Sequence, residues 1–81
     1  MKNMIIGTIV RLERLNNSIY GNPRYEVVIR DESGDYYFYA KSASNAYWVY
    51  AIDKYLGKKN LFHYHITKAG NNIIDDIDLI V

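Results

Sequence analysis

Four consecutive aromatic residues followed by a cation are the part of this sequence whose residue types could perform a recognisable chemistry. Tyr36-Tyr37-Phe38-Tyr39 precede Ala40 and Lys41, and the run just before them carries Arg24 and Arg30. Bases of single-stranded nucleic acid stack on exposed aromatic rings while cations follow the phosphates, and each stacked base contributes ~1–3 kcal/mol. Tyrosine and arginine are also the residues that dominate protein–protein interfaces.

A simpler interpretation of the tyrosines competes with these two. Tyrosine often covers small β-proteins because its ring packs while its hydroxyl stays hydrated. Ten Lys and Arg against nine Asp and Glu leave a net charge of +1, which offers few phosphate contacts. The segment from Met1 to Arg30 has five basic and two acidic residues, whereas Asp75, Asp76 and Asp78 would repel a nucleic-acid backbone.

Two histidines give the sharpest metal-binding pattern. His63 and His65 would share one face of a strand, and Asp75 or Asp76 on a neighbouring strand could complete a site. Two histidines without further ligands are a weak signal, and both residues fit equally well as solvent-facing members of an alternating strand. We therefore expect no metal site and no cofactor.

The sequence carries no recognisable catalytic constellation. It has no nucleophile elbow, phosphate-binding loop, zinc-protease motif or calcium-loop spacing, and it has no cysteine. We therefore expect a non-enzymatic protein. No apolar run approaches the ~18 residues that span a bilayer, and the first residues are too few for a signal peptide. The expectation is a cytoplasmic protein with no membrane partner.

Eighty-one residues, 49% of them hydrophobic, fit a single domain over 1–81. Alternating and β-branched runs predict strands at 4–14, 24–31, 36–41, 61–67 and 73–81. Turn-forming residues predict an exposed loop at 16–23, which carries Tyr20, and a turn at 69–72, next to Lys68. Cap residues at 42–45 and Gly57 bracket a predicted helix. A helical period of 3.6 gives that helix an apolar face of Ala43, Ala46, Tyr47, Tyr50 and Ala51.

Alternation along the strands predicts which side chains share a face. Tyr37, Tyr39 and Lys41 should point away from the face that Phe38 and Ala40 occupy. The predicted interior residues of the second and fourth strands are Tyr25, Val27, Ile29, Phe62, Tyr64 and Ile66. Gly7, inside the first strand, predicts a bulge or bend that would let this strand serve two sheets.

The order of elements, β-β-β-α-β-β, is similar to the OB-fold, a five-stranded Greek-key barrel with a helix between its third and fourth strands. An SH3-like barrel and a twisted open sheet with a packed helix are the competing folds. Asn-Ser-x-x-Gly-Asn-Pro-Arg-Tyr at 17–25 and Asn-Ala-x-x-x-Tyr-x-Ile at 45–52 resemble segments of small proteins from phages and mobile elements. That resemblance implies an origin in a phage or mobile element, and it implies no activity.

These observations predict a non-enzymatic OB-like barrel that binds single-stranded DNA or RNA through the face of its second and third strands. The alternative is a phage or plasmid accessory protein that binds a host protein, such as a nuclease or defence enzyme, and inhibits or redirects it. Either partner would contact Tyr20, Arg24, Arg30, Tyr37, Tyr39, Lys41 and Lys68. Affinity for nucleic acid should fall steeply with salt, whereas an aromatic protein interface should change little.

Overall fold

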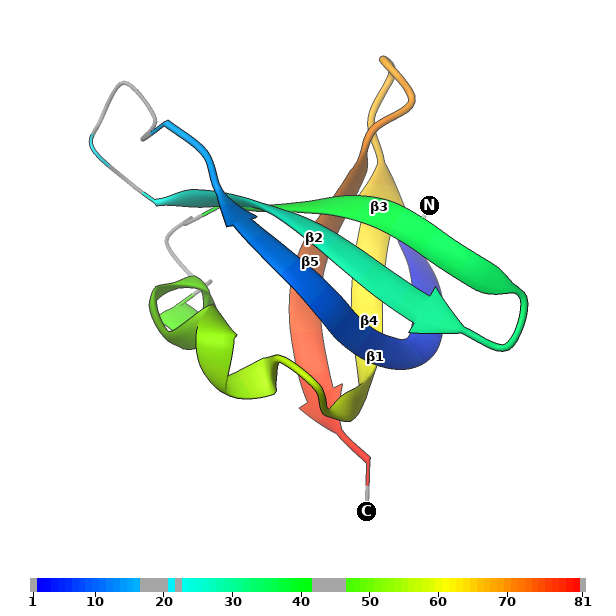
Figure 1. Cartoon of the computed structure of the whole chain (residues 1–81). Coiled ribbons are helices and arrows are strands. Elements are labelled where there is room, and N and C mark those ends of the chain that lie inside the picture. Colours follow the sequence, from blue (N-terminus) through cyan, green and yellow to red (C-terminus); the bar gives the residue numbers. More distant parts are fainter. Residues whose placement is uncertain (1, 17–20, 22, 42–46, 81) are drawn as a thin grey trace.

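Five strands and one short helix make up the protein, as seen in a computed structural model that describes residues 2–16, 21, 23–41 and 47–80. The strands are β1 (Lys2–Arg14), β2 (Arg24–Asp31), β3 (Gly34–Lys41), β4 (Lys59–Ile66) and β5 (Asn72–Leu79). The helix, η1 (Tyr47–Tyr55), lies between β3 and β4 in the chain (Figure 1). The predicted order of elements is therefore confirmed.

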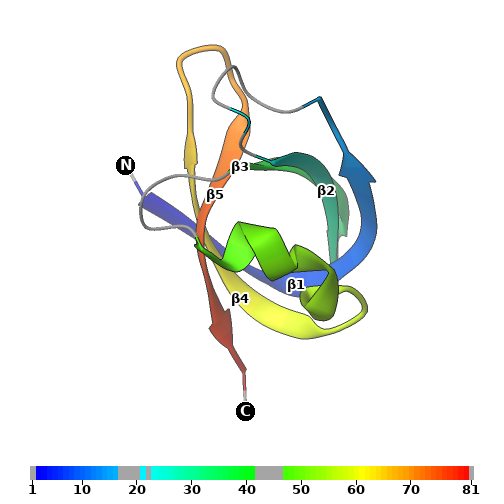
Figure 2. The same cartoon turned by 90° about the vertical axis from the view of Figure 1, so that its left-hand side faces the viewer.

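The strands form a closed barrel in the order β1-β2-β3-β5-β4. All neighbouring pairs are antiparallel except β3 and β5, which run parallel and pair at Tyr39 and Ile73. In Figure 2 the strands surround a common centre, and η1 lies across this ring. This arrangement confirms the predicted OB-like barrel, in place of an open sheet.

β1 pairs with two different strands, one along each half of its length. Its first half, from Lys2 to Thr8, pairs with β4, and its second half, from Thr8 to Arg14, pairs with β2. The first strand therefore serves two neighbours, as the sequence predicted. The register shift with β2 lies between Ile9 and Arg11 and not at Gly7, whereas the change of partner from β4 to β2 falls at Thr8, next to this glycine.

Gly7 has a different role, which is to let two strands approach closely. A Cβ atom at this position would lie 2.7 Å from the carbonyl oxygen of Arg30 and 2.7 Å from Cγ2 of Ile29. Contacts that short do not occur in well-packed proteins, so any side chain here would push β1 away from β2. The glycine is required by packing, and the register shift follows beyond it, between Ile9 and Arg11.

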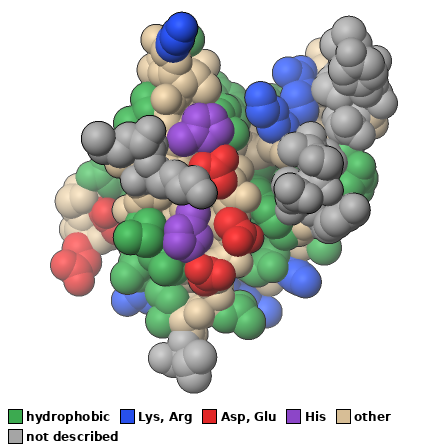
Figure 3. Space-filling model, turned by 180° about the vertical axis from the view of Figure 1, so that it is seen from behind, with side chains coloured by type: hydrophobic (Ala, Val, Ile, Leu, Met, Phe, Trp, Pro, Cys, Tyr) green, Lys and Arg blue, Asp and Glu red, His purple; other side chains and the backbone are tan. Residues whose placement is uncertain are grey.

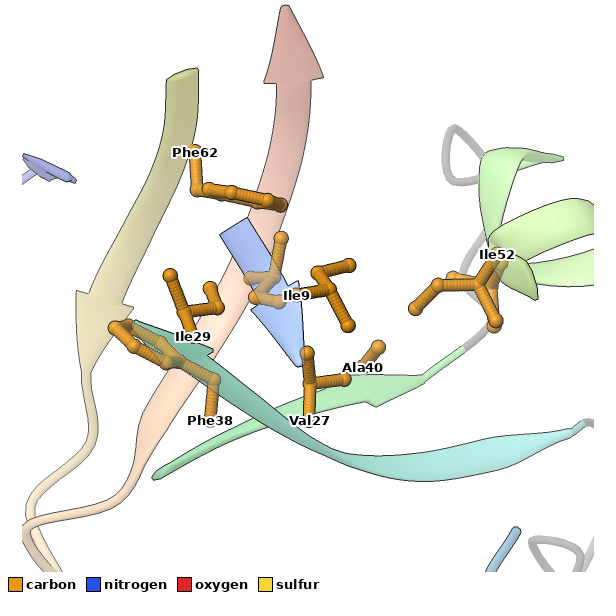
Figure 4. Close-up of a cluster of buried hydrophobic side chains, with 9 residues drawn as sticks. Ile9, Val27, Ile29, Phe38, Ala40, Ile52 and Phe62 are labelled. Carbon is orange, nitrogen blue, oxygen red and sulfur yellow. The ribbon is translucent and has the colours of Figure 1, made fainter. Parts of the chain in front are cut away.

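Every strand and the helix contribute to one hydrophobic core (Figure 4). Its buried members are Ile9, Val27, Ile29, Phe38, Ala40, Val49, Ile52, Phe62 and Ile74. Tyr25 and Tyr64 pack against this cluster, and the ring of Tyr64 meets Phe38 edge-on with 4.9 Å between the centroids. Five of the six predicted interior residues thus face the core.

Ile66 is the exception, because 55% of it is exposed and the prediction that it lies inside is wrong. It is the last residue of β4 and pairs with Asn72, the first residue of β5. This end of the β4–β5 hairpin projects beyond the barrel in Figure 1. Alternation continues along the strand, but no core remains there to receive the side chain.

The helix differs from the prediction in both type and buried face. η1 is a 3₁₀ helix with a non-helical residue at Ala51 (φ −125°, ψ 30°). Val49 and Ile52 are buried and Tyr55 packs against the core, whereas Tyr50, placed on the predicted apolar face, is 61% exposed. Side chains three residues apart align on a 3₁₀ helix, so a period of 3.6 residues predicted the wrong buried face.

Some predictions concern residues that the structure does not describe. The helix cap at 42–45, Ala43, Ala46 and Tyr20 lie outside the described residues, as does the side chain of Tyr47. Within the described part of the chain, no helix has the length and apolar character needed to cross a membrane.

Candidate ligand-binding face

A tight turn fixes the hairpin that carries most of the predicted binding residues. Residues 32 and 33 join Asp31 to Gly34, which are paired across the hairpin. Asp31 Oδ1 accepts hydrogen bonds from the Ser33 hydroxyl (2.8 Å), the Ser33 N–H (2.7 Å) and the Gly34 N–H (3.2 Å). These hydrogen bonds, that from the Ser33 hydroxyl foremost, lower the pKa of Asp31. The carboxylate holds the turn and so sets the register of both strands.

This register lines up the side chains on the outer face of the hairpin. The cross-strand neighbours are Arg24 and Lys41, Glu26 and Tyr39, Val28 and Tyr37, and Arg30 and Asp35. Tyr37 is 60% exposed and Tyr39 half-buried, whereas Phe38 and Ala40 are buried on the inner side. The predicted division of β3 into two faces is confirmed.

One end of this face is hollowed, with a volume of about 230 Å³. Its lining is Leu15, Arg24, Tyr25, Tyr39, Ala40, Lys41, Asn71 and Ile73. The hollow therefore joins the chain after β1, the start of β2, the end of β3 and the turn between β4 and β5. Three of the predicted binding residues, Arg24, Tyr39 and Lys41, come together here.

Arg24 and Lys41 give the described wall of this hollow a positive charge, while Glu26 lies opposite Tyr39 on the neighbouring strand. Arg24 is oriented by a hydrogen bond from its Nε to the carbonyl oxygen of Asn16 (2.8 Å). Arg14 lies over the ring of Tyr25, with its Cζ 5.4 Å from the centroid, and its Nη1 donates to the Tyr25 hydroxyl at 3.3 Å. None of the described residues that line the hollow carries a carboxylate. An anion in the hollow would meet Arg24 and Lys41, and Glu26 would oppose it from beside Tyr39.

Sequence reasoning missed several parts of this hollow. Arg14 was not singled out, although its pairing with Tyr25 follows from the β1–β2 register. Tyr25 was assigned to the interior and is only half-buried, at the border between core and hollow. Asn71 and Ile73 line the hollow only because β5 lies beside β3 in the closed barrel. The local sequence gives no signal for this closure.

Other predicted binding residues lie elsewhere. Arg30, at the far end of β2, donates from Nε and Nη2 to the two carboxylate oxygens of Asp35 (2.7 and 3.1 Å). These hydrogen bonds lower the pKa of Asp35 and raise that of Arg30. Lys68 is exposed in the β4–β5 turn, between Thr67 and Asn71, whose backbones are hydrogen-bonded. The structure thus separates Arg30 from the hollow.

The two histidines lie on the outer side of β4, and each contacts an aspartate of β5. His63 Nε2 is 2.6 Å from Asp78 Oδ2, and His65 Nδ1 is 2.8 Å from Asp75 Oδ1. Figure 3 shows both histidines with acidic side chains on this side of the barrel. In the part of the chain that the structure describes, no group of three or more His, Cys, Asp or Glu residues could hold a metal ion.

Comparison of this chain with protein-family models, curated proteins and solved structures finds no match. The resemblance to phage and mobile-element proteins stays a prediction from the sequence.

Proposed function

We propose that this protein binds single-stranded nucleic acid along the outer face of β2 and β3. The observation that carries the proposal is the hollow in which Arg24 and Lys41, paired across the strands, lie beside Tyr39, with no carboxylate among the described residues of its wall. Cations that contact phosphates next to an aromatic ring on which a base can stack are the combination used by sequence-tolerant single-strand binders.

The exposed residues around the hollow support a path for such a strand. Tyr37 follows Tyr39 on the same face of β3, and its 60% exposure leaves its ring accessible to a second base. Lys68 is exposed in the turn that also supplies Asn71 to the hollow. Arg30 is engaged by Asp35, so we assign it no phosphate.

The expected salt dependence is modest because the site has few cations. Each phosphate contact with a single strand contributes about −0.7 to the slope of log K against log salt concentration. Contacts from Arg24, Lys41 and Lys68 would give a slope of about −2. A larger basic patch would give a steeper slope, which a chain with a net charge of +1 does not favour.

Fluorescence anisotropy with labelled DNA and RNA strands of ~15 nucleotides tests the proposal, because this length reaches the upper range of one OB site. Arg24→Gln should weaken binding and reduce the salt slope by about 0.7. Arg30→Gln is the matched control, since it changes the net charge equally at a residue outside the hollow. Joint replacement Tyr37→Ala and Tyr39→Ala should weaken binding by ~2 kcal/mol or more through lost stacking.

Two results would overturn the proposal. Absence of binding to DNA and RNA at low salt would leave the host-protein hypothesis, in which the same tyrosines act as interface anchors. Equal effects of Arg24→Gln and Arg30→Gln would show that binding depends on overall charge and not on the hollow. Melting temperatures of the variants provide the control for folding.

A further inference from the structure

Glu26 is a carboxylate placed beside the ring on which the proposed function stacks a base. It lies directly opposite Tyr39 in the pairing of β2 with β3, so both side chains stand on the same outer face. Directly opposed residues of an antiparallel pair have their Cβ atoms about 4.5–5.5 Å apart. A base that covers the ring of Tyr39 therefore brings its edge within reach of this carboxylate.

The strand on the other side of Glu26 presents a like charge. β2 lies between β3 and β1, and the β1 residue opposite Glu26 is Glu13. Like charges directly opposite one another destabilise a strand pair. Glu13 accepts a hydrogen bond from Arg11 at 3.3 Å, whereas Glu26 has no hydrogen bond or ion pair in the described part of the chain. The fold thus keeps a half-buried carboxylate without a partner on either neighbouring strand.

The chemistry of single-stranded DNA leaves one kind of group for Glu26 to contact. A carboxylate accepts hydrogen bonds and donates none. Phosphates are anionic acceptors, so Glu26 repels them, and their place is beside Arg24 and Lys41, the next outward-facing pair along the hairpin. The donor groups along a DNA strand are the N–H groups on the edges of its bases. Only a base edge can therefore supply Glu26 with a hydrogen-bond partner.

The four bases differ in what their Watson–Crick edges offer a carboxylate. Guanine presents its N1–H and its N2 amino group side by side, so it can donate to both oxygens of one carboxylate. Cytosine and adenine each present one amino group. Thymine presents a single N–H between two carbonyl oxygens, which a carboxylate repels. Guanine is therefore the best partner for Glu26, and thymine is the worst.

We propose that Glu26 makes the Tyr39 position selective for guanine over thymine by accepting the N1–H and N2–H groups of the stacked base. The inference rests on the proposed function and adds a base preference to it. Arg24 and Lys41 contribute affinity for any sequence, because they contact phosphates. Glu26 opposes strands whose bases cannot donate to it, so the preference comes from repulsion of thymine as well as from hydrogen bonds to guanine.

Fluorescence anisotropy of the full chain with three labelled DNA strands of ~15 nucleotides tests this preference. One strand contains only thymine, the second contains thymine–thymine–guanine repeats, and the third has inosine in place of each guanine. The wild-type chain should bind the guanine strand ~5-fold or more tightly than the thymine strand, since a bidentate contact to a base discriminates by at least this factor. Inosine keeps N1–H but lacks the amino group, so its strand should bind with intermediate affinity. Lithium buffer keeps the guanine strand unfolded.

Glu26→Gln separates base selection from a general effect of charge. The variant should bring the ratio of the two affinities close to one, by strengthening binding of the thymine strand and weakening binding of the guanine strand. Loss of a negative charge alone would strengthen binding of both strands equally. Glu32→Gln is the matched control, because it removes the same charge from an exposed residue of the hairpin turn and should leave the ratio unchanged. Glu26→Gln should fold at least as stably as the wild type, since it removes the repulsion from Glu13.

Failure of this inference and failure of the proposed function give different results. Equal affinity of the wild-type chain for all three strands, with binding weakened by Arg24→Gln, would overturn the role of Glu26 and leave nucleic-acid binding in place. A guanine preference that survives Glu26→Gln would also overturn that role. Absence of binding to every strand at low salt would overturn both proposals.

Discussion

Replacing Phe62 and Ile66 separately by alanine tests which side chains of β4 hold the barrel together. Phe62 is fully buried in the core cluster, so Phe62→Ala should lower the free energy of unfolding by ~3–5 kcal/mol. Full burial of an isoleucine contributes ~1.5–3 kcal/mol. Ile66 is 55% exposed, so Ile66→Ala should lower the free energy of unfolding by about half of that contribution, ~1 kcal/mol.

Urea unfolding followed by the fluorescence of Trp48 measures both effects. Trp48 is the only tryptophan and packs against the core, so its emission should report loss of the barrel. A domain of this size has a total stability of ~4–12 kcal/mol, so Phe62→Ala should be largely unfolded or unfold at far lower urea than the wild type. Ile66→Ala should shift the midpoint by about 1 M or less. Equal shifts, or a larger shift for Ile66→Ala, would refute the assignment of inner and outer residues on β4.

Two further predictions concern close packing and charge. Gly7→Ala should destabilise the barrel by ~1–3 kcal/mol in the same urea assay, because its methyl group would meet the Arg30 carbonyl, and wild-type stability would contradict the close approach of β1 to β2. Because Arg30 lowers the pKa of folded Asp35, their contact stabilises the fold above the unfolded pKa of about 4, and this contribution is lost as pH falls through the folded value. Asp35→Asn should therefore lower the melting temperature near neutral pH but not in strong acid, and a constant difference between the two proteins across pH would contradict this reasoning.

The parts of the fold that depend on neighbouring residues could be predicted from the sequence. Alternation placed Val27 and Ile29 in the interior and separated Phe38 from Tyr37 and Tyr39, whereas the register that pairs Arg24 with Lys41 is known only from the structure. The buried face of η1 could not be predicted in the same way. Which side chains of the helix share a face depends on whether it has three or 3.6 residues per turn, and packing against the barrel decides this number.

Contacts between distant segments explain the remaining differences. Ile66 continues the alternation of Phe62 and Tyr64, and only the length of the barrel decides that it lies beyond the core. The hollow needs Asn71 beside Lys41, which requires β5 to close against β3. Sequence reasoning could therefore name the cations and tyrosines of the binding face, but not the concave shape that collects some of them and leaves Arg30 apart.

The sharing of β1 between two neighbours has a consequence for how the chain folds. The hairpin of β2 and β3 joins adjacent segments, but β1 reaches β4 only when residues as distant as Lys2 and His65 meet. The chain loses the entropy of closing so long a loop before it gains the contacts between β1 and β4. Domains with such long-range strand pairing fold in milliseconds to seconds. Until that closure, a chain with β1 paired only to β2 exposes the half of β1 from Lys2 to Thr8 as a free strand. We expect this closure to be the slow step of folding and the one during which the chain is most exposed to aggregation.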